Sequence, residues 1–312
     1  MKILVAGAGG VGLYFGGRLA QGGAEVSVVV RSDFEAMTRQ GGCRIQSIAG
    51  DFFFAPHRIL RSATEYDETA DYVILTAKVL PDIDAAALLK PAVRSDRTAI
   101  VLIQNGIDIE PPVGAAFPDN TLLSAIAYIG VSRPSPGTVL HQGSGSLKMG
   151  RYPSGIGEAA EKLAAAFAAG GVRCELFDDI ARVRWEKLLW NLPFNPISVL
   201  AGGVDTARMT QRDELEALCR ALMEETAAVA AACGQSFTAR EFDAMTEYTR
   251  NFPPYKTSML QDYEAGRKLE TEAILGNALR LARRHHVAVP RMECCYALLK
   301  SMDQTNQNKA AK

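Results

Sequence analysis

The chain has 312 residues, with 34 lysines and arginines against 35 aspartates and glutamates and a formal net charge of -1. Hydrophobic residues make up 48% and charged residues 22%, which is typical of globular proteins and excludes a disordered chain. No basic excess exists to neutralise phosphates, which argues against a nucleic-acid-binding module. The length suggests about two domains. We recognise no secretory signal and no run of about 18 uncharged apolar residues, so we expect no membrane span and a cytoplasmic location.

The first half of the chain alternates short apolar runs with helical stretches. Continuous apolar strands separated by helices are typical of a parallel sheet covered on both faces. The predicted strands lie at residues 2–6, 25–30, 72–77, 99–103, 122–128 and 172–177. Residues 138–142 and 146–149 are predicted to form an antiparallel hairpin, with Gly143-Ser-Gly145 as its turn.

From about residue 180, strand-like runs give way to long helical patterns. The predicted helices lie at residues 213–232, 264–286 and 292–302, with Pro290 between the last two. The polar tail at 303–312 is expected to fray. We therefore predict an α/β fold in which a doubly wound parallel sheet at residues 1–178 precedes an all-helical domain at 179–312.

A glycine-rich loop follows the first predicted strand and begins a helix at residues 13–21. In such a loop the first glycine makes the tight turn, the second lets the backbone approach a pyrophosphate, and the third packs helix on strand. The phosphates then meet free N–H groups at the positive end of the helix dipole. The alternative is a glycine-rich turn that binds nothing. We predict that the loop binds a dinucleotide through Gly7, Ala8, Gly9, Gly10, Val11 and Gly12.

The residue after the second predicted strand favours NADP(H). Arg31 stands there, and a guanidinium suits a 2′-phosphate because it donates two parallel hydrogen bonds. NAD binders carry a carboxylate at this point for the ribose 2′-hydroxyl. Asp33, two residues further on, is the alternative, since it could serve as that ribose-binding acid.

Further candidate side chains lie at strand ends and along one helix. Lys78 and Asn105 follow two predicted strands, and doubly wound sheets bind ligands at the carboxyl ends of their strands. Lys187, Asn191 and Asn195 recur at every fourth residue, which places them on one helix face. Pro193 should kink or end that helix. The structural alternatives are a solvated lysine, a turn asparagine and helix-end amides.

Taken together, these segments resemble the ketopantoate reductase (2-dehydropantoate 2-reductase) family. The resemblance extends from Met1 to about Leu299, with the motifs in the same order. It rests on the glycine loop, Thr76-Ala-Lys78, Gln104-Asn-Gly106, Trp185-Glu-Lys187 with Asn191 and Asn195-Pro196, and Ser258-Met-Leu-Gln-Asp262.

The resemblance implies an N-terminal Rossmann domain, a helical C-terminal domain and a site in the cleft between them. It implies NADPH-dependent reduction of ketopantoate to (R)-pantoate, towards pantothenate and coenzyme A, by a homodimer. Lys187 would be the general acid, and Glu270 would bind the substrate hydroxyl and orient Lys187. The substrate-binding residues would be Asn191, Asn195 and Ser258. Lys78, Asn105 and Glu270 would contact the cofactor, and Asn105 would also take part in catalysis.

Two departures leave the substrate open. Asp205 stands where one branch of the family has a substrate-binding asparagine, and Thr271-Glu272-Ala-Ile-Leu-Gly276 replaces the usual Ile-Asp-x-x-Asn-Gly. A carboxylate near an anionic keto acid is unfavourable, so either Asp205 points away or the substrate differs. The alternatives are another branched or aromatic 2-oxo acid and, from a different class, an NADPH-binding sensor without chemistry.

Cysteine and histidine spacing favours no metal site. The six cysteines form no C-x-x-C pair, so we expect reduced thiols and no metal. A histidine-acid dehydrogenase could use His141, His285 or His286, but none lies at a motif position. His285-His286 follows two arginines, which is typical of a basic helix end.

Overall fold

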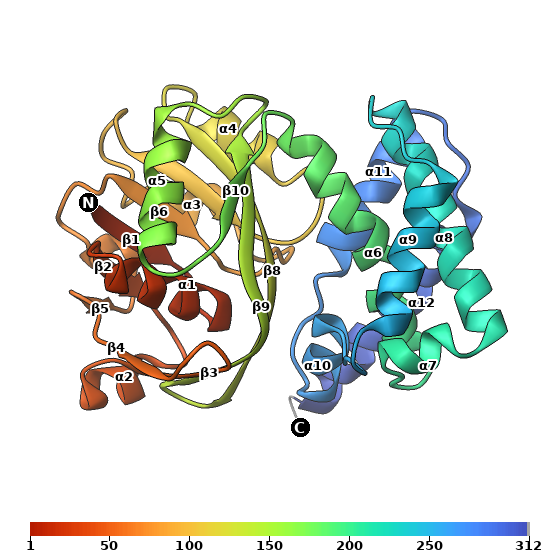
Figure 1. Ribbon diagram of the computed structural model, residues 1–312, viewed down its shortest axis with the longest axis horizontal. Helices are drawn as coiled ribbons and strands as arrows, with labels where there is room; N and C mark the ends of the chain where they lie inside the picture. Colours follow the sequence, from red (N-terminus) through yellow and green to blue (C-terminus); the bar gives the residue numbers. More distant parts are fainter. Residues whose placement is uncertain (311–312) are drawn as a thin grey trace. The chain divides into compact units, whose positions relative to one another are not determined.

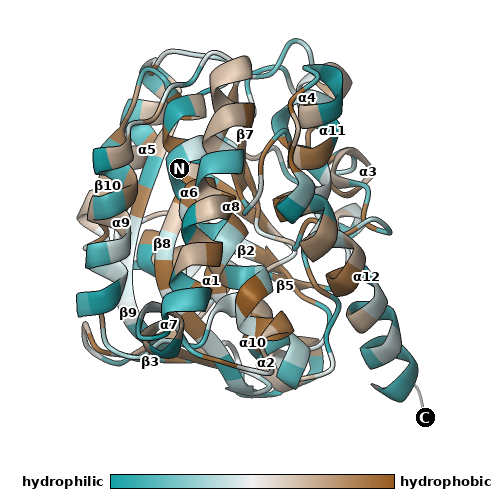
Figure 2. Cartoon of the chain, turned by 90° about the vertical axis from the view of Figure 1, so that its right-hand side faces the viewer, coloured by the Kyte–Doolittle hydropathy of each residue, from teal (hydrophilic) through white to brown (hydrophobic). Residues whose placement is uncertain are grey.

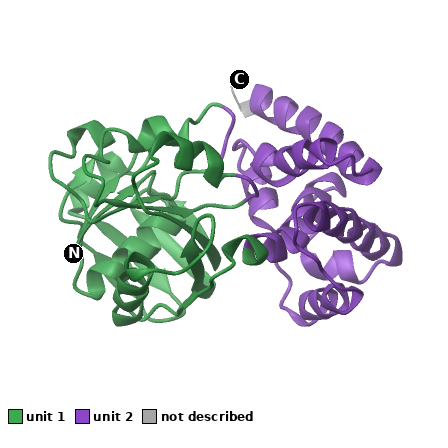
Figure 3. Cartoon of the chain, turned by 90° about the horizontal axis from the view of Figure 1, so that it is seen from above, with its two compact units in different colours: residues 1–78, 82–105, 109–183 green, residues 79–81, 106–108, 184–312 purple. Residues whose placement is uncertain are grey.

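The computed structural model describes residues 1–310, which cluster into two compact units (Figure 3). Unit 1 comprises residues 1–78, 82–105 and 109–183, and unit 2 comprises 79–81, 106–108 and the chain from Arg184 onward. Two short segments that follow strands of unit 1 therefore belong to unit 2. No described helix is both long enough and apolar enough to cross a lipid bilayer.

Unit 1 is built on a sheet that contains ten strands within the described residues. They are β1 (Lys2–Ala6), β2 (Glu25–Val29), β3 (Cys43–Ser47), β4 (Phe52–Phe54), β5 (Ile59–Leu60), β6 (Tyr72–Leu75), β7 (Ala99–Ile103), β8 (Leu122–Ser135), β9 (Thr138–Arg151) and β10 (Cys174–Leu176). Their order is β4-β3-β9-β8-β7-β6-β1-β2-β5, and β10 pairs with β9. Strands β6 and β7 are buried at every residue, as their uninterrupted apolar runs predict.

The sheet is doubly wound, as predicted. Strands β5, β2, β1, β6, β7 and β8 are parallel, and the chain moves outward in opposite directions from β1 and from β6. Right-handed crossovers then place helices on opposite faces. Helices α1 (Gly10–Gln21) and α5 (Glu158–Ala169) contact each other on one face, and α3 (Ala85–Leu89) and α4 (Glu110–Ala116) do so on the other (Figure 1). The short helices α2 (Phe34–Gln40) and η1 (Ala63–Glu65) complete unit 1.

The hairpin predicted within residues 138–149 is wrong. These residues form one strand, β9, which pairs antiparallel with β8, and the chain reverses at Pro136-Gly137. Tyr128 pairs with Ser146 and Ile129 with Ser144, which leaves Gly145 as an extra residue. Its φ of 108° suits a β-bulge as well as a turn, so the glycines alone did not distinguish the two.

Unit 2 is helical, which confirms the predicted class of the second half. Its helices are α6 (Ile180–Leu200, of which the first residues belong to unit 1), α7 (Thr206–Thr210), α8 (Asp213–Ala232), α9 (Ala239–Asn251), α10 (Ser258–Glu264), the π-helical turn η2 (Glu272–Gly276), α11 (Asn277–Arg284) and α12 (Pro290–Ala310). Leu188, Leu189 and Leu192 of α6 lie in a single apolar core with buried residues of α8, α11 and α12.

Two expectations about helix ends were wrong, and a third was wrong in part. Of the two outcomes expected at Pro193, a helix end is excluded, because α6 continues to Leu200. The helix predicted at 264–286 is instead interrupted after α10 and resumes at η2. The tail expected to fray is helical as far as Ala310, and the carboxyl end of α12 is polar in Figure 2. Residues 311–312 of that tail lie outside the described residues.

Candidate active site

The glycine loop after β1 is shaped by its contacts with the end of β6. Gly7 has a φ of 67°, and a Cβ at Gly12 would collide with the Oγ1 atom of Thr76. The Thr76 hydroxyl also donates a hydrogen bond of 3.1 Å to the Gly7 carbonyl. A Cβ at Gly9 would meet no atom of the described residues within 4 Å, so the backbone is open at the position where the sequence predicts a pyrophosphate.

The start of α1 is suited to an anion. Gly9 is the N-cap and provides no side-chain hydrogen bond, and the first turn carries no acidic residue. The backbone N–H groups of that turn are therefore available to a ligand, at the positive end of the helix dipole. This arrangement fits the phosphates of a dinucleotide.

Arg31 and Asp33 differ sharply in their surroundings. Arg31 is exposed, and its guanidinium makes no hydrogen bond or ion pair with any other described residue. Asp33 is only 2% exposed and accepts hydrogen bonds of 2.9 Å from the Gly137 N–H and from the Ser32 hydroxyl. It also forms an ion pair with Arg133. The carboxylate of Asp33 is thus already occupied, which weighs against a role as ribose-binding acid.

Lys78 and Asn105 follow adjacent parallel strands, β6 and β7, at the edge of the sheet that carries the glycine loop. Both are partly buried. The Gln104 side chain donates a hydrogen bond of 2.5 Å to the Ala77 carbonyl, which joins the two strand ends. Unit 1 therefore brings together the cofactor-binding residues that the sequence predicts at the ends of β1, β6 and β7.

Lys187, Asn191 and Asn195 lie on the uninterrupted helix α6, so they share one face despite Pro193. Asn191 is 6% exposed, and its amide makes no hydrogen bond within the described chain. Asn195 is 1% exposed and fully engaged. Its Oδ1 accepts from the Met259 N–H at 3.2 Å and from the Ser258 hydroxyl at 3.3 Å, and its Nδ2 donates to the Asn191 carbonyl at 3.1 Å.

The surroundings of Lys187 favour loss of its proton. The pKa of Lys187 is lowered to about 8, first by burial and second by the Arg184 guanidinium, whereas the Glu270 carboxylate acts to raise it. Glu270 accepts a hydrogen bond of 3.0 Å from the Val79 N–H. An ammonium with a lowered pKa can both stabilise a developing negative charge and release a proton near neutral pH.

Arg184 was missed by the sequence analysis. It is 4% exposed, lies one helical turn before Lys187 and donates a hydrogen bond of 2.9 Å to the Gly106 carbonyl. Gly106 has a φ of 100°, and a Cβ there would lie 2.5 Å from the Ala273 carbonyl oxygen. The Gln104-Asn-Gly106 motif therefore needs its glycine. Nothing in the local sequence pattern identified Arg184 as the hydrogen-bond partner of Gly106.

The segment that departs from the usual family motif forms the π-helical turn η2, with Thr271 as the N-cap next to Glu270. Ala273 of this turn accepts a hydrogen bond of 3.1 Å from the Ile107 N–H, and Asn277 donates one of 2.6 Å to the Ile107 carbonyl. Segment 106–108 is thus fixed against η2. Single π-helical turns occur frequently at functional sites.

Asp205 has a structural role that the sequence analysis left open. It is the N-cap of α7, and its carboxylate accepts a hydrogen bond of 2.9 Å from the Arg208 N–H. Capping satisfies one of the N–H groups that a helix start leaves without an intrahelical partner. Ser258, in contrast, is exposed at the start of α10 and contacts only Asn195 among the predicted site residues.

The histidines do not join these groups. His141 is 1% exposed, lies against the ring of Tyr14 and hydrogen-bonds to Ser47 Oγ at 2.9 Å. Burial lowers the pKa of His141, which favours the neutral ring. His285 and His286 are exposed at the end of α11.

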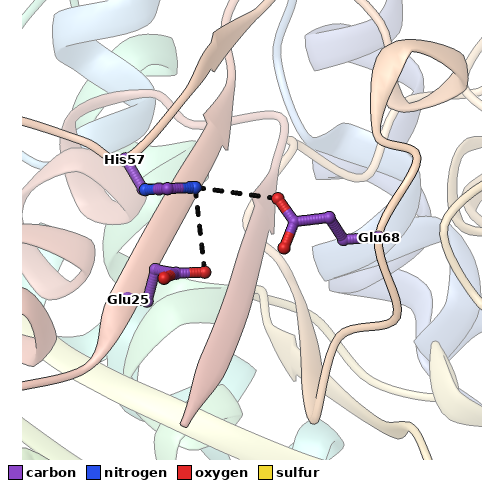
Figure 4. Close-up of side chains that lie close together, drawn as sticks. All are labelled: Glu25, His57 and Glu68. Carbon is purple, nitrogen blue, oxygen red and sulfur yellow. Dashed lines mark ion pairs between the residues drawn. The ribbon is translucent and has the colours of Figure 1, made fainter.

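One histidine and two carboxylates approach metal-ligand spacing, at the other end of the sheet (Figure 4). His57 Nε2 lies 3.8 Å from Glu25 and 3.7 Å from Glu68. Lys2 forms ion pairs with both carboxylates. Lys2 and Glu25 begin β1 and β2, whereas the glycine loop follows the end of β1. The cluster is therefore an ion-pair network remote from the loop.

Comparison with known proteins identifies the family. The family model "Ketopantoate reductase PanE/ApbA" matches residues 3–154, and its C-terminal counterpart matches residues 179–303. The chain is 30% identical to the 2-dehydropantoate 2-reductase of Nostoc sp. over 316 residues, which cover 98% of this chain and 96% of the relative. The chain belongs to the ketopantoate reductase family. It is therefore an oxidoreductase.

Solved structures agree with this placement. A 2-dehydropantoate 2-reductase from Methylococcus capsulatus is 46% identical, with a TM-score of 0.91 and 98% of each chain covered. A D-mandelate dehydrogenase in complex with NADH and anilino(oxo)acetate shares the fold at 22% identity, with a TM-score of 0.87, over 98% of this chain and 99% of that one.

Proposed function

We propose that the chain catalyses the NADPH-dependent reduction of 2-dehydropantoate (ketopantoate) to (R)-pantoate, on the route to pantothenate and coenzyme A. Family membership supports the reaction type. The single observation that carries the proposal is the environment of Lys187, whose pKa is lowered to about 8 by burial and by Arg184. Catalytic acids and bases are the groups whose pKa values proteins shift towards neutrality.

A nicotinamide cofactor suits the residues of unit 1. The open backbone at Gly9 and the N-terminus of α1 would bind the pyrophosphate, and the exposed guanidinium of Arg31 would bind a 2′-phosphate. Lys78 and Asn105 would contact the rest of the cofactor from the strand ends. When bound, the nicotinamide supplies the hydride.

The residues of unit 2 would then handle the substrate oxygen and its proton. Hydride addition to a ketone builds negative charge on oxygen, and Lys187 would stabilise that charge and donate a proton from Nζ. Glu270, whose carboxylate raises the pKa of Lys187, would keep the proton on Nζ until it is needed and bind the substrate hydroxyl. Asn191 would bind the substrate through its amide, and Asn195 would act by positioning Ser258.

A reductase of another branched or aromatic 2-oxo acid is the second candidate. Asp205 caps α7, so the additional substrate-binding asparagine of one family branch has no counterpart in this chain. The mandelate dehydrogenase that shares the fold binds an aromatic 2-oxo acid derivative. A non-catalytic sensor is less well supported, since it would have no use for a lysine with a lowered pKa.

The test is NADPH consumption with purified enzyme. Ketopantoate, branched 2-oxo acids and aromatic 2-oxo acids are compared by kcat/KM, each with NADPH and with NADH, and the Lys187→Ala variant serves as the control. The highest kcat/KM with ketopantoate supports the proposal, and a higher value with another acid supports the second candidate. If no acid supports NADPH oxidation, the non-catalytic NADPH-binding sensor is the remaining candidate. We also expect the protein to be a homodimer and to lie in the cytoplasm. Light scattering after size-exclusion chromatography measures the oligomeric state.

A further inference from the structure

Arg133 lies at the far end of β8, where this strand passes the glycine loop. A Cβ at Gly10 would lie 3.4 Å from Val131 Cγ2 and 3.7 Å from Arg133 Cγ, which places the stem of Arg133 over the first turn of α1. Its Nη1 donates a hydrogen bond of 2.8 Å to the Ser32 hydroxyl, in the loop after β2. Arg133 therefore bridges the glycine loop and the β2–α2 loop. In dinucleotide-binding sheets the residue after the second strand contacts the adenosine ribose.

The side chain of Arg133 is held in place by the carboxylate of Asp33. The buried carboxylate forms an ion pair with Arg133 through Nη1. It also accepts from the Gly137 N–H and from the Ser32 hydroxyl, so its other lone pairs are satisfied. A buried carboxylate that accepts from several donors is held in one position, and it fixes the guanidinium that pairs with it. The orientation of Arg133 is thus set before any ligand arrives.

The rest of the Arg133 guanidinium remains available. Its side chain is 34% exposed, and within the described chain Nε and Nη2 make no hydrogen bond. These two nitrogens form the planar fork that binds phosphate with two parallel hydrogen bonds. Arg31, two residues before Asp33, adds a second exposed guanidinium. The single carboxylate of Asp33 neutralises one of these two charges and leaves an excess of one beside Ser32.

We propose that Arg133, held by Asp33, is a second cation of the site for the 2′-phosphate of NADP(H) and a determinant of cofactor choice. The inference rests on the proposed NADPH dependence and extends it. A preoriented guanidinium loses less conformational entropy on binding than a flexible one such as Arg31. A ribose with a free 2′-hydroxyl offers this fork one neutral oxygen in place of a charged phosphate, and the Asp33 carboxylate already has its own donors, so NADH would bind less tightly.

Binding of adenosine fragments to the full-length enzyme tests the assignment without catalysis. Titration calorimetry compares 2′,5′-ADP, which carries the 2′-phosphate, with 5′-AMP, which lacks it. For Arg133→Ala we expect affinity for 2′,5′-ADP to fall by about 10- to 100-fold, the range for hydrogen bonds to charged groups, and that for 5′-AMP to change less than twofold. Arg133→Lys should recover part of the loss. Arg151→Ala, which removes an exposed arginine at the end of β9, is the control.

The outcomes separate this inference from the proposed function. If the wild-type enzyme and Arg31→Ala differ in preference for 2′,5′-ADP but Arg133→Ala equals wild type, Arg133 only supports the turn between β8 and β9, and the inference is refuted. If wild type shows no preference for 2′,5′-ADP, NADPH dependence and the inference both fail. Asp33→Asn should keep 5′-AMP binding and lose part of the preference. A stronger preference in Asp33→Asn would mean that Asp33 repels the phosphate, which also contradicts the inference.

Discussion

Replacing Arg184 by methionine should raise the pH at which the enzyme loses its reductase activity. Lys187 must carry its proton to act as an acid, so kcat/KM for reduction should fall as the pH rises through the pKa of Lys187, about 8. Burial is the largest cause of that lowered pKa and Arg184 is the second. Removal of the guanidinium leaves the burial in place, so the pKa should rise without reaching the ordinary value of 10.5.

The size of the shift follows from the spacing on α6. Arg184 and Lys187 are one helical turn apart, and two unit charges at that spacing repel by on the order of 1–3 kcal/mol at an effective dielectric constant of about 20. One pKa unit corresponds to about 1.4 kcal/mol. We therefore expect the alkaline limb of the kcat/KM profile to move by about one unit, which is less than the whole displacement of Lys187.

The assay is a pH series of kcat/KM with a 2-oxo acid that the enzyme reduces. Arg184→Lys keeps a positive charge at this point of α6 and should leave the limb at about pH 8. Arg208→Met removes an exposed arginine of α7 and serves as the control for charge effects at a distance. Arg184 also donates to the Gly106 carbonyl, so the absolute rate is expected to drop in the methionine variant.

The position of the limb distinguishes electrostatics from this structural loss. A methionine variant that is slower at every pH, with its limb where wild type has it, would show that Arg184 only supports segment 106–108. A limb that moves to lower pH would contradict the sign of the charge effect.

Three further substitutions probe single contacts. Lys187→Ala should lower turnover by about 10²-fold or more, with nucleotide binding measured by calorimetry largely kept, because it removes only the proton donor; near wild-type turnover would exclude Lys187 as the acid. Gly12→Ala places a Cβ against Thr76 Oγ1 and should lower the free energy of unfolding by about 1–3 kcal/mol in urea titrations, together with nucleotide affinity. Asp205→Ala removes the cap of α7 and should cost about 1 kcal/mol of stability with KM for the keto acid unchanged; a tenfold change in KM would place Asp205 at the substrate.

The glycine loop could be predicted because each of its glycines answers a local demand. Gly7 has a positive φ, which glycine adopts most easily. Gly12 has no Cβ, and Thr76 Oγ1 occupies the space that a Cβ would take. Gly9 leaves the backbone open. These demands arise within one strand–loop–helix unit, where the order of residues alone determines which atoms meet. The uninterrupted apolar strands were predictable for the same reason, since burial on both faces leaves no alternation in the pattern.

Features that depend on pairing between distant segments could not be predicted. The Asp33–Arg133 ion pair joins positions a hundred residues apart, and only the register of β8 brings them together. The bulge in β9 was taken for a turn, because glycines with a positive φ serve both. The role of Arg184 could not be predicted, because its acceptor, the Gly106 carbonyl, lies 78 residues away in the sequence.

The break between α10 and η2 has a local sequence signal, a glycine, which the sequence analysis did not use because the surrounding residues resemble a helix. Gly266 has a φ of 65°, and the Arg267 N–H donates to the Asp262 carbonyl at 2.8 Å. A left-handed glycine with such a hydrogen bond is a common way for a helix to end. The helix predicted at 264–286 ran across this break, because the whole stretch was interpreted as one helical pattern. Because of the break, Glu270 lies just before Thr271, the N-cap of η2, rather than at mid-helix.

The face of α6 that carries Lys187, Asn191 and Asn195 has two roles, one chemical and one structural, which the sequence pattern does not separate. Lys187 needs a desolvated environment for its lowered pKa, and a polar group buried in such an environment is costly unless it has a hydrogen-bond partner. Asn195 meets this requirement, since its Oδ1 accepts from the buried Met259 N–H. Without the Asn195 amide, the Met259 N–H would lack a hydrogen-bond partner, at a cost of about 1–3 kcal/mol, and the Ser258 hydroxyl would lose its contact with Oδ1. The asparagine two turns from the lysine therefore supports the chemistry from within the core, and its substitution should impair Lys187 and Ser258 together.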